Sequence, residues 1–198
     1  MAITYVDKPS DKAVAGFESR CESLKRRLRD ADFLHNRGLG NEVGIYTFCY
    51  DPRLKLRARR FFNRVESDPS LPCNIREYNL YDILLAICEE RRILAAIPKM
   101  EEKKGNEHLI RQLSAVATPE AFAEKIADRP NESGDVVLIT GVGEAYPFMR
   151  VHNILDNIQH LFEEVPVVVA YPGRFNGQTL SLFGRMGDGN YYRAFDLI

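Results

Sequence analysis

Two kinds of apolar pattern run along the chain, and together they predict a protein of alternating strands and helices. Short apolar runs rich in β-branched residues indicate buried strands, whereas apolar positions three and four apart indicate helices that bury one face. We expect strands at residues 43–50, 73–78, 135–140 and 165–171. We expect helices at residues 10–28, 52–66, 80–88, 101–116 and 147–162, and a further helix that starts after Thr118-Pro119.

The first helix is predicted from a single apolar stripe. Its members recur at steps of three and four residues: Val14, Phe17, Cys21, Leu24 and Leu28. Ser10 is placed to cap the start of this helix, and the basic residues within 25–29 suit the negative end of the helix dipole. We expect residues 1–42 to form a helical N-terminal arm of a single domain that spans residues 1–198.

The stretch 135–195 is the most informative, because two apolar strands each run into a glycine-containing loop with a helix between them. This order is typical of an open, mostly parallel sheet with helices on both faces. Residues 180–183 and 191–195 are then expected to pair as an antiparallel C-terminal hairpin across the turn at 187–190. The predicted fold class is α/β, with one Rossmann-like or P-loop-like domain that lacks a phosphate-binding loop.

The loop after the strand at 135–140 contains glycines, but it lacks the other residues of a nucleotide-binding loop. A Walker loop needs a lysine followed by a hydroxyl residue, and a dinucleotide loop needs a third glycine where this chain has Tyr146. The carboxylate of Glu144 would also repel a phosphate. We therefore expect no cofactor here and interpret the loop as a tight turn that exposes Glu144, Tyr146 and Phe148, because exposed aromatic residues often mark partner surfaces.

Arg174 and Phe175 follow the strand at 165–171, in a loop with two turn signals. If this strand and the strand at 135–140 are parallel, their carboxyl ends meet at one edge of the sheet. Arg174 and Phe175 would then lie at the same edge as Glu144 and Tyr146. This common edge is the binding surface that the sequence predicts.

The helix expected at 52–66 carries a row of arginines. Their spacing of four, three and four residues places them along one side of the helix: Arg53, Arg57, Arg60 and Arg64. A row of guanidinium groups suits phosphates or a partner rich in carboxylates. Three interpretations stay open for this row: a solvated face with ion pairs elsewhere, a contact for an acidic protein, and a contact for nucleic acid.

The composition narrows the classes of function without choosing one. Hydrophobic residues make up 45% and charged residues 28% of the 198 residues, which suits a protein with a packed core. The net charge of −1 gives no indication of a protein that binds nucleic acid. No apolar run approaches the roughly 20 residues that span a bilayer, and the N-terminus does not resemble a secretory signal. The cysteines lack Cys-x-x-Cys spacing and are expected to be buried, reduced thiols of a cytoplasmic protein: Cys21, Cys49, Cys73 and Cys88.

Motifs for catalysis and metal binding are weak. No Gly-x-Ser-x-Gly elbow occurs, and the four histidines do not show metal-binding spacing. Asp51, Glu77 and Asp82 are the candidate carboxylates of a metal nuclease near strand ends, but the lysine expected two residues after the second acid is absent. We therefore expect no enzyme activity and no metal site.

Two C-terminal segments closely resemble the BrxB family of BREX bacteriophage-defence systems. Residues 138–155 contain the motif Thr-Gly-Val-Gly-Glu-Ala-Tyr-Pro-Phe, and residues 165–184 contain Ala-Tyr-Pro-Gly-Arg-Phe-Asn-Gly-Gln. Tyr-Asp-Pro at 50–52 and Tyr-Asn-Leu-Tyr-Asp at 78–82 are also similar to that family. The length close to 200 residues extends the resemblance over the whole chain.

The resemblance implies a small cytoplasmic accessory protein of a system that marks host DNA by methylation and blocks unmarked phage DNA. It implies a non-enzymatic adaptor that binds another BREX protein, and PglZ, the alkaline-phosphatase-like component, is the expected partner. The resemblance carries over no catalytic residue. The alternative is a degenerate nucleotide- or nucleic-acid-binding domain that uses the face of Arg53, Arg57, Arg60 and Arg64.

Overall fold

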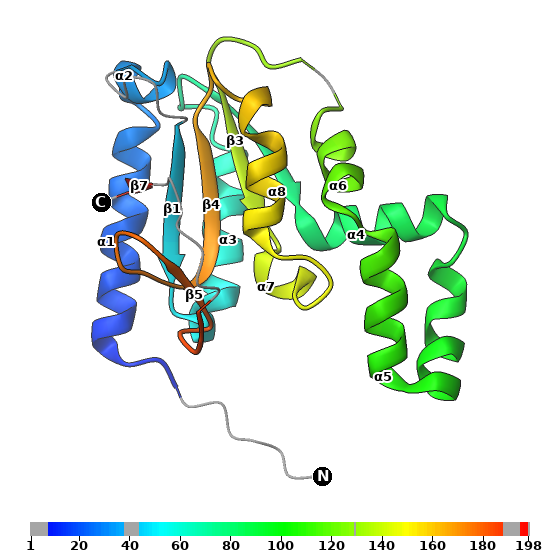
Figure 1. Cartoon of the computed structure of the whole chain (residues 1–198). Helices are drawn as coiled ribbons and strands as arrows, with labels where there is room; N and C mark the ends of the chain where they lie inside the picture. Colours follow the sequence, from blue (N-terminus) through cyan, green and yellow to red (C-terminus); the bar gives the residue numbers. More distant parts are fainter. Residues whose placement is uncertain (1–7, 38–43, 129, 188–194, 198) are drawn as a thin grey trace.

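The computed structural model describes residues 8–37, 44–128, 130–187 and 195–197, and its centre is a mostly parallel β-sheet (Figure 1). The strand order across the sheet is β2-β3-β4-β1-β7, and every pairing along this path is parallel. The strands are β1 (Ile45–Tyr50), β2 (Asn74–Asn79), β3 (Asp135–Thr140), β4 (Val167–Phe175) and β7 (Phe195–Asp196). The predicted α/β class is therefore confirmed.

Helices cover both faces of the sheet. One face packs against α1 (Asp11–Arg27), α2 (Ala31–Leu34) and α3 (Lys55–Glu66). The other face packs against α4 (Leu80–Glu90), α5 (Ile97–Val116), α6 (Pro119–Ile126), α7 (Val142–Ala145) and α8 (Val151–Ile158). Short 3-10 turns precede α3 and α5, namely η1 (Pro52–Leu54) and η2 (Leu94–Ala96), and a third, η3 (Gln159–Leu161), follows α8.

The continuous apolar run of β3 explains why this strand lies inside the sheet. Successive side chains of a strand point to opposite faces, so a strand covered by helices on both sides is apolar at every position. Val136 and Leu138 belong to the core beneath α1 and α3, whereas Val137 and Ile139 belong to the core beneath α4 to α8. All four side chains are at most 3% exposed.

Aromatic packing fixes α1 and α3 against β1. The Phe48 ring is fully buried, and its centroid lies 5.9 Å from that of Phe17, 5.8 Å from that of Phe61 and 5.2 Å from that of Phe62. Edge-on and offset ring contacts at such distances contribute about 0.5–1.5 kcal/mol each beyond the burial of area. The helix at the N-terminus is therefore part of the layer that covers this face of the sheet.

The helix predicted at 101–116 is longer and interrupted. α5 bends at Gly105, whose φ of 76° and ψ of 170° are accessible essentially to glycine alone. Its two halves project from the side of the sheet (Figure 1), and residues 101–107 between them are exposed. Among the described residues, none of the helices combines the length and the apolar character needed to cross a membrane.

The helix predicted at 147–162 forms over a shorter range. The backbone N–H groups of Phe148 and Met149 both donate to the carbonyl oxygen of Ala145, at 2.9 and 3.1 Å. These bonds continue α7 into a turn, so α8 begins only at Val151. The tight turn expected after β3 is likewise a short helix, α7, which follows Gly141 in the left-handed conformation.

Antiparallel pairing near the C-terminus is confirmed, but the strands involved differ from the prediction. β5 (Leu180–Leu182) pairs with the end of β4 and with β6 (Met186–Gly187). The predicted pairing of 180–183 with 191–195 is wrong at Phe195, which joins β1 in parallel, and residues 188–194 lie outside the described residues. The reason is that β4 continues past Tyr171 and itself offers β5 an antiparallel partner.

Candidate functional site

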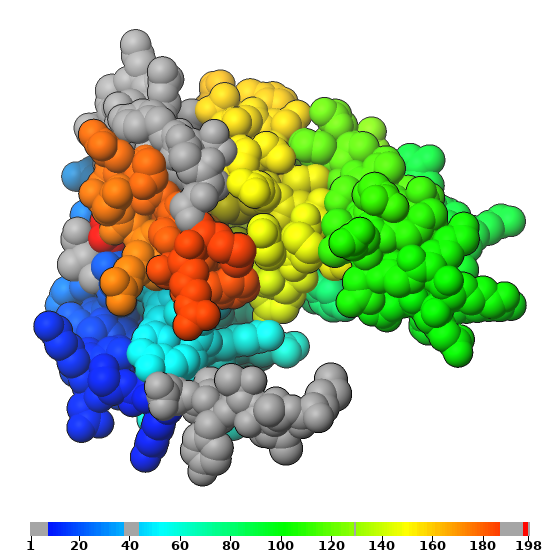
Figure 2. Space-filling model, turned by 60° about the horizontal axis from the view of Figure 1, so that its bottom comes forward, coloured from blue at the N-terminus to red at the C-terminus, as the bar shows by residue number. Residues whose placement is uncertain are grey.

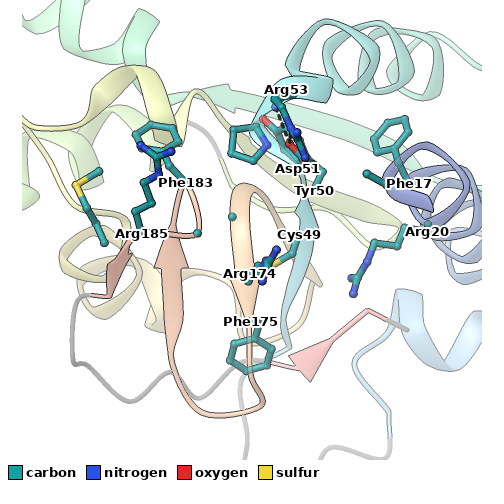
Figure 3. A pocket seen from close by; sticks show the side chains of 16 residues that line it. Phe17, Arg20, Cys49, Tyr50, Asp51, Arg53, Arg174, Phe175, Phe183 and Arg185 are labelled. Atoms are coloured by element: carbon teal, nitrogen blue, oxygen red, sulfur yellow. Dashed lines mark hydrogen bonds and ion pairs between the residues drawn. The ribbon is translucent and has the colours of Figure 1, made fainter. Parts of the chain in front are cut away.

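A groove of about 1220 Å³ opens at the carboxyl ends of the central strands β1 and β4. Its walls come from α1, from the segment that follows β1 and from the β4–β5–β6 region (Figure 3). Figure 2 shows this edge of the molecule, with α1 in blue, the start of α3 in cyan and the β4–β5 region in orange. Ligands of open α/β sheets characteristically bind at this end of the strands.

Four arginines from four different segments line the groove: Arg20, Arg53, Arg174 and Arg185. Arg20 donates two hydrogen bonds of 2.8 and 3.3 Å to the carboxylate of Asp196, so its charge is compensated. Arg174 and Arg185 are exposed, and within the described residues neither has an ion-pair or hydrogen-bond partner. Figure 3 shows Arg174 at the centre of the groove, between Arg20 and Arg185.

Asp51 is the carboxylate in the wall of this groove, and it holds Arg53 in place. It accepts hydrogen bonds from the backbone N–H of Arg53 at 2.9 Å and from the Arg53 guanidinium at 2.9 and 2.6 Å. These guanidinium bonds hold the pKa of Asp51 below its ordinary value, although partial burial acts in the opposite direction. Asp51 is therefore ionised and paired with Arg53 at neutral pH.

Aromatic side chains supply the apolar part of the groove. Phe17 is 7% exposed and belongs to the core beneath α1, so only its edge reaches the groove. Phe175 and Phe183 are half-buried and pack against the core of the opposite face. Figure 3 places Phe183 beside Arg185 and Phe175 beyond Arg174.

The loop after β3 differs from the predicted exposed edge. Tyr146 and Phe148 are half-buried and pack against the core beneath α7 and α8, so the expectation that they are exposed is wrong. The cause is the short helix α7, which turns these rings inward over the sheet. Glu144 is partly exposed and forms an ion pair of 2.8 Å with Lys55 at the start of α3.

The predicted meeting of two strand ends is confirmed. β3 and β4 pair in parallel, with Ile139 opposite Val169, so the loops after both strands lie at the same edge of the sheet. Arg174 and Phe175 therefore lie at the edge that also carries Glu144 and Tyr146. Whether a partner binds there stays a prediction.

The predicted arginine row lies on the exposed side of η1 and α3, opposite the buried residues of that helix. Arg57 pairs with Glu18 of α1 at 3.6 Å, and Arg53 pairs with Asp51. Within the described part of the chain, Arg60 and Arg64 have no ion-pair partner. The row is thus compensated at Arg53 and Arg57, whereas Arg60 and Arg64 have no ion-pair partner among the described residues.

The three candidate carboxylates lie in different surroundings, and of these three it is Asp51 that lines the groove. Asp51 binds Arg53, Glu77 accepts a hydrogen bond from Thr140, and Asp82 lies exposed in the first turn of α4. In the described ranges, no three histidine, cysteine or acidic residues form a group that could hold a metal ion. The cysteines are free thiols, three of them buried and Cys73 partly buried.

Arg20 and Arg185 are groove residues that the sequence analysis does not single out. Both are placed by contacts between distant segments, because α1 packs across the sheet and β5 turns back onto β4. One local feature in this region is visible in the sequence. Gly16 interrupts the helical pattern of α1, and an isolated glycine within a helix often has a packing or functional reason.

The chain is similar to known proteins over most of its length. The family model described as BREX protein BrxB matches residues 76–197. A protein of Bacillus cereus (strain H3081.97) named BREX protein BrxB is 38% identical over 187 residues, which cover 90% of this chain and 96% of that protein. A protein of the same name from Escherichia coli O9:H4 (strain HS) is 31% identical over 186 residues, 91% of each chain. No solved structure matches the chain significantly.

Proposed function

The chain belongs to the BrxB family of BREX proteins, and we propose that it is a non-enzymatic, cytoplasmic adaptor of a BREX phage-defence system. We propose that it binds another BREX component, and that this component is PglZ. Membership of a multi-component system supplies the context for a binding role. The exposed face of α3 is the observation that supports the proposal.

The outward ridge of α3 combines an apolar anchor with uncompensated positive charge. Helical spacing places Leu56, Arg60 and Asn63 at the centre of this ridge, with Arg59 and Arg64 on its flanks. Leu56 is 69% exposed, the largest exposure among the large apolar side chains of the described residues. Burying such a leucine in a partner would contribute about 1–2 kcal/mol, and arginine is among the residues most enriched at interface hot spots.

The chemistry of this ridge defines the partner surface that would complement it. An apolar pocket is needed for Leu56, and carboxylates on either side of it would pair with Arg60 and Arg64. Opposite charge on the two surfaces also accelerates association and disfavours partners of the wrong charge. We therefore propose that PglZ presents an acidic surface with an apolar centre to α3.

Two features support a role without catalysis. Burial raises the pKa of the Cys21 and Cys49 thiols to about 12, so both are protonated and poorly nucleophilic at neutral pH. Asp51, the carboxylate of the groove wall, is already committed to Arg53. The proposal therefore rests on binding by the exposed arginines and not on chemistry by these groups.

The proposal is tested by co-expression with PglZ and co-purification of the complex. We expect PglZ to co-purify with the unaltered chain, and we expect the double variant Arg60→Glu, Arg64→Glu to weaken binding by about tenfold or more. The matched control is Lys103→Glu with Lys104→Glu, which makes the same charge change on the exposed tip of α5. Failure of PglZ to bind the unaltered chain, or equal loss in the control, would contradict the proposal.

DNA contact by the same face is a second candidate. It is favoured by Arg59, Arg60 and Arg64, which have no carboxylate partner within the described residues and lie on one side of α3. Binding to phosphates releases counterions, so the affinity for duplex DNA would fall steeply as salt rises. A gel-shift titration between about 50 and 200 mM salt separates this candidate from a PglZ contact anchored by Leu56.

A further inference from the structure

The groove between α1 and the β4–β5–β6 region carries more positive charge than its own carboxylates compensate. Among the described residues, four arginines line it, and Asp51 is the acidic residue that lines it with them. Asp51 binds Arg53, and Asp196 beside the groove binds Arg20. Arg174 is close enough to Asp51 to help lower the pKa of that carboxyl, but among the described residues neither Arg174 nor Arg185 forms an ion pair, and both are exposed on the groove wall.

Gly16 gives a second and independent observation. It lies in the middle of α1 and lines the groove, and a Cβ built there would have no atom within 4 Å. Glycine destabilises the interior of a helix relative to alanine, and no side chain or backbone atom of the described residues lies close enough to require a glycine here. A glycine that faces open space in a groove keeps the helix backbone accessible to whatever enters.

Two half-buried aromatic rings belong to the wall of the groove that the β4–β5–β6 region forms, opposite α1. Phe175 follows Arg174 directly, and Phe183 lies two residues before Arg185. Both rings pack against the core, and both line the groove that Arg174 and Arg185 also line (Figure 3). Flat aromatic surfaces beside arginines are the combination that binds nucleobases and phosphates together.

We propose that this groove binds a nucleoside phosphate, with its phosphates at Arg174 and Arg185 and its base against Phe175 or Phe183. The proposal goes beyond the adaptor function, because it uses a different surface from the α3 ridge. Two kinds of ligand offer both phosphates and a base: a free nucleotide and a single strand of nucleic acid. The site is also distinct from the loop after β3, whose Glu144 and missing lysine do not suit a phosphate.

A nucleoside phosphate fits the groove better than an acidic peptide. All the basic lining residues are arginines, and a guanidinium matches two oxygens of a phosphate at once. The volume of about 1220 Å³ exceeds the roughly 300–1,000 Å³ of ordinary small-molecule sites, so there is room for a complete nucleotide or more. A peptide carboxylate would satisfy the arginines but would leave the two aromatic rings unused.

The test is fluorescence anisotropy of the full chain with a fluorescein-labelled single-stranded oligothymidylate, with ATP as the competitor. We expect saturable binding that weakens as salt rises. The double variant Arg174→Glu, Arg185→Glu should lower the affinity by about tenfold or more, whereas Lys103→Glu with Lys104→Glu should change it by less than about twofold. Competition by ATP identifies a nucleotide site, and binding of the oligonucleotide without such competition identifies a strand site; either result supports the proposal.

Gly16→Leu provides a variant in which a defect of folding and a defect of binding can be told apart. The leucine side chain projects into the open groove, so we expect an unchanged or higher melting temperature together with loss of binding. The proposal is overturned if the unaltered chain binds neither probe, or if a poly-glutamate peptide competes as well as the oligonucleotide does. It is also overturned if Gly16→Leu binds normally. Loss of PglZ binding in the α3 variants would leave all these results unchanged.

Discussion

Burial sets the chemistry of the cysteine side chains. It raises the pKa of Cys21 and Cys49 to about 12 and that of Cys73 to about 11. The positive charges of Lys25, Arg20 and Arg29 act in the opposite direction but are smaller effects. A thiol without its proton would therefore be a buried charge, which the folded protein disfavours.

This burial predicts a loss of stability at alkaline pH. The thiol pKa in the unfolded chain is near 9.0, so the stabilisation is fully present below about pH 9 and is lost as pH rises towards 12. The Cys49 thiol should lower the free energy of unfolding by up to about 1.4 kcal/mol per pH unit in that range. Guanidinium unfolding at several pH values from 8 to about 10.5 measures this slope. The dependence of the free energy of unfolding on pH should be weaker in Cys49→Ala. An identical dependence would show that the Cys49 thiol does not cause the loss of stability.

Two glycines predict opposite effects of the same substitution. A Cβ at Gly173 would lie 2.1 Å from the carbonyl oxygen of Ser181, so Gly173→Ala must push β4 and β5 apart and should cost about 1–3 kcal/mol. A Cβ at Gly16 meets nothing within 4 Å, so Gly16→Ala should stabilise α1 by about 0.5–1 kcal/mol. Thermal unfolding of the two variants checks both signs, and destabilisation by Gly16→Ala would show that its surroundings are not open.

Residues whose role depends on close neighbours in the sequence are predictable. Ser10 and Thr118 both cap helices, accepting hydrogen bonds from the N–H groups of Ala13 and Ala121, as their positions indicate. The exposure of Tyr146 and Phe148 is not predictable in this way. Whether a ring after a strand points outward depends on how the following turn lies over the sheet, which is a tertiary property.

At the scale of elements, a buried arginine joins β2 to β3 and to the loop before β3. The side chain of Arg76 is 3% exposed, and it donates to the carboxylates of Asp135 at 3.1 Å and Asp128 at 3.3 Å. It also donates to the hydroxyl oxygen of Tyr78 at 2.6 Å and to the side chain of Asn131 at 2.9 Å. The bonds to Asp128, Asn131 and Asp135 link segments that are more than 50 residues apart in sequence.

Removing this guanidinium should destabilise the protein strongly. Arg76→Met keeps most of the volume but leaves the carboxylate of Asp135, which is 5% exposed, without its cation. Breaking one partner of a buried ion pair typically costs about 3–5 kcal/mol. Chemical denaturation measures the loss. Adding Asp135→Asn to Arg76→Met should recover part of it, and a double variant less stable than the sum of the single variants would argue against the pairing.

Elements with a strong periodic pattern were predictable, whereas their partners were not. The stripe of α1 and the apolar runs of β3 and β4 are local features, so these elements lie close to their predicted ranges. The partner of β5 depends on how far β4 continues, and the apolar run of β4 gives no sign that pairing extends through Arg174 and Phe175. The sequence indicates the bend of α5 only through Gly105, because a glycine within a helical pattern weakens the helix at that point.

At the scale of the whole molecule, the strand order brings the residues of the groove together. β1 lies between β4 and β7, so α1, the segment after β1 and the β4–β5–β6 region surround one edge of the sheet. The sequence predicts a common edge with Arg174 and Phe175, and it predicts Arg53 only as a member of the arginine row on the helix at 52–66. Arg20, Arg185 and the groove itself depend on crossovers between distant segments, which no local pattern specifies.

The same architecture separates the two proposed binding surfaces. The ridge of α3 faces away from the sheet, whereas the groove opens at the strand ends, so a partner on α3 and a ligand in the groove use different arginines. Arg53 lies where the two surfaces approach each other, at the start of η1. Charge reversal at Arg60 and Arg64 and charge reversal at Arg174 and Arg185 are therefore expected to affect different ligands.

Isothermal titration of the purified chain into purified PglZ tests the adaptor proposal most directly. We predict saturable binding at a fixed stoichiometry, with loss of most of the heat when Arg60→Glu and Arg64→Glu are combined with Leu56→Ala. The control with Lys103→Glu and Lys104→Glu should bind as the unaltered chain does. Absence of binding by the unaltered chain at about 10 μM of each protein, which corresponds to an affinity weaker than roughly −7 kcal/mol, would contradict the account.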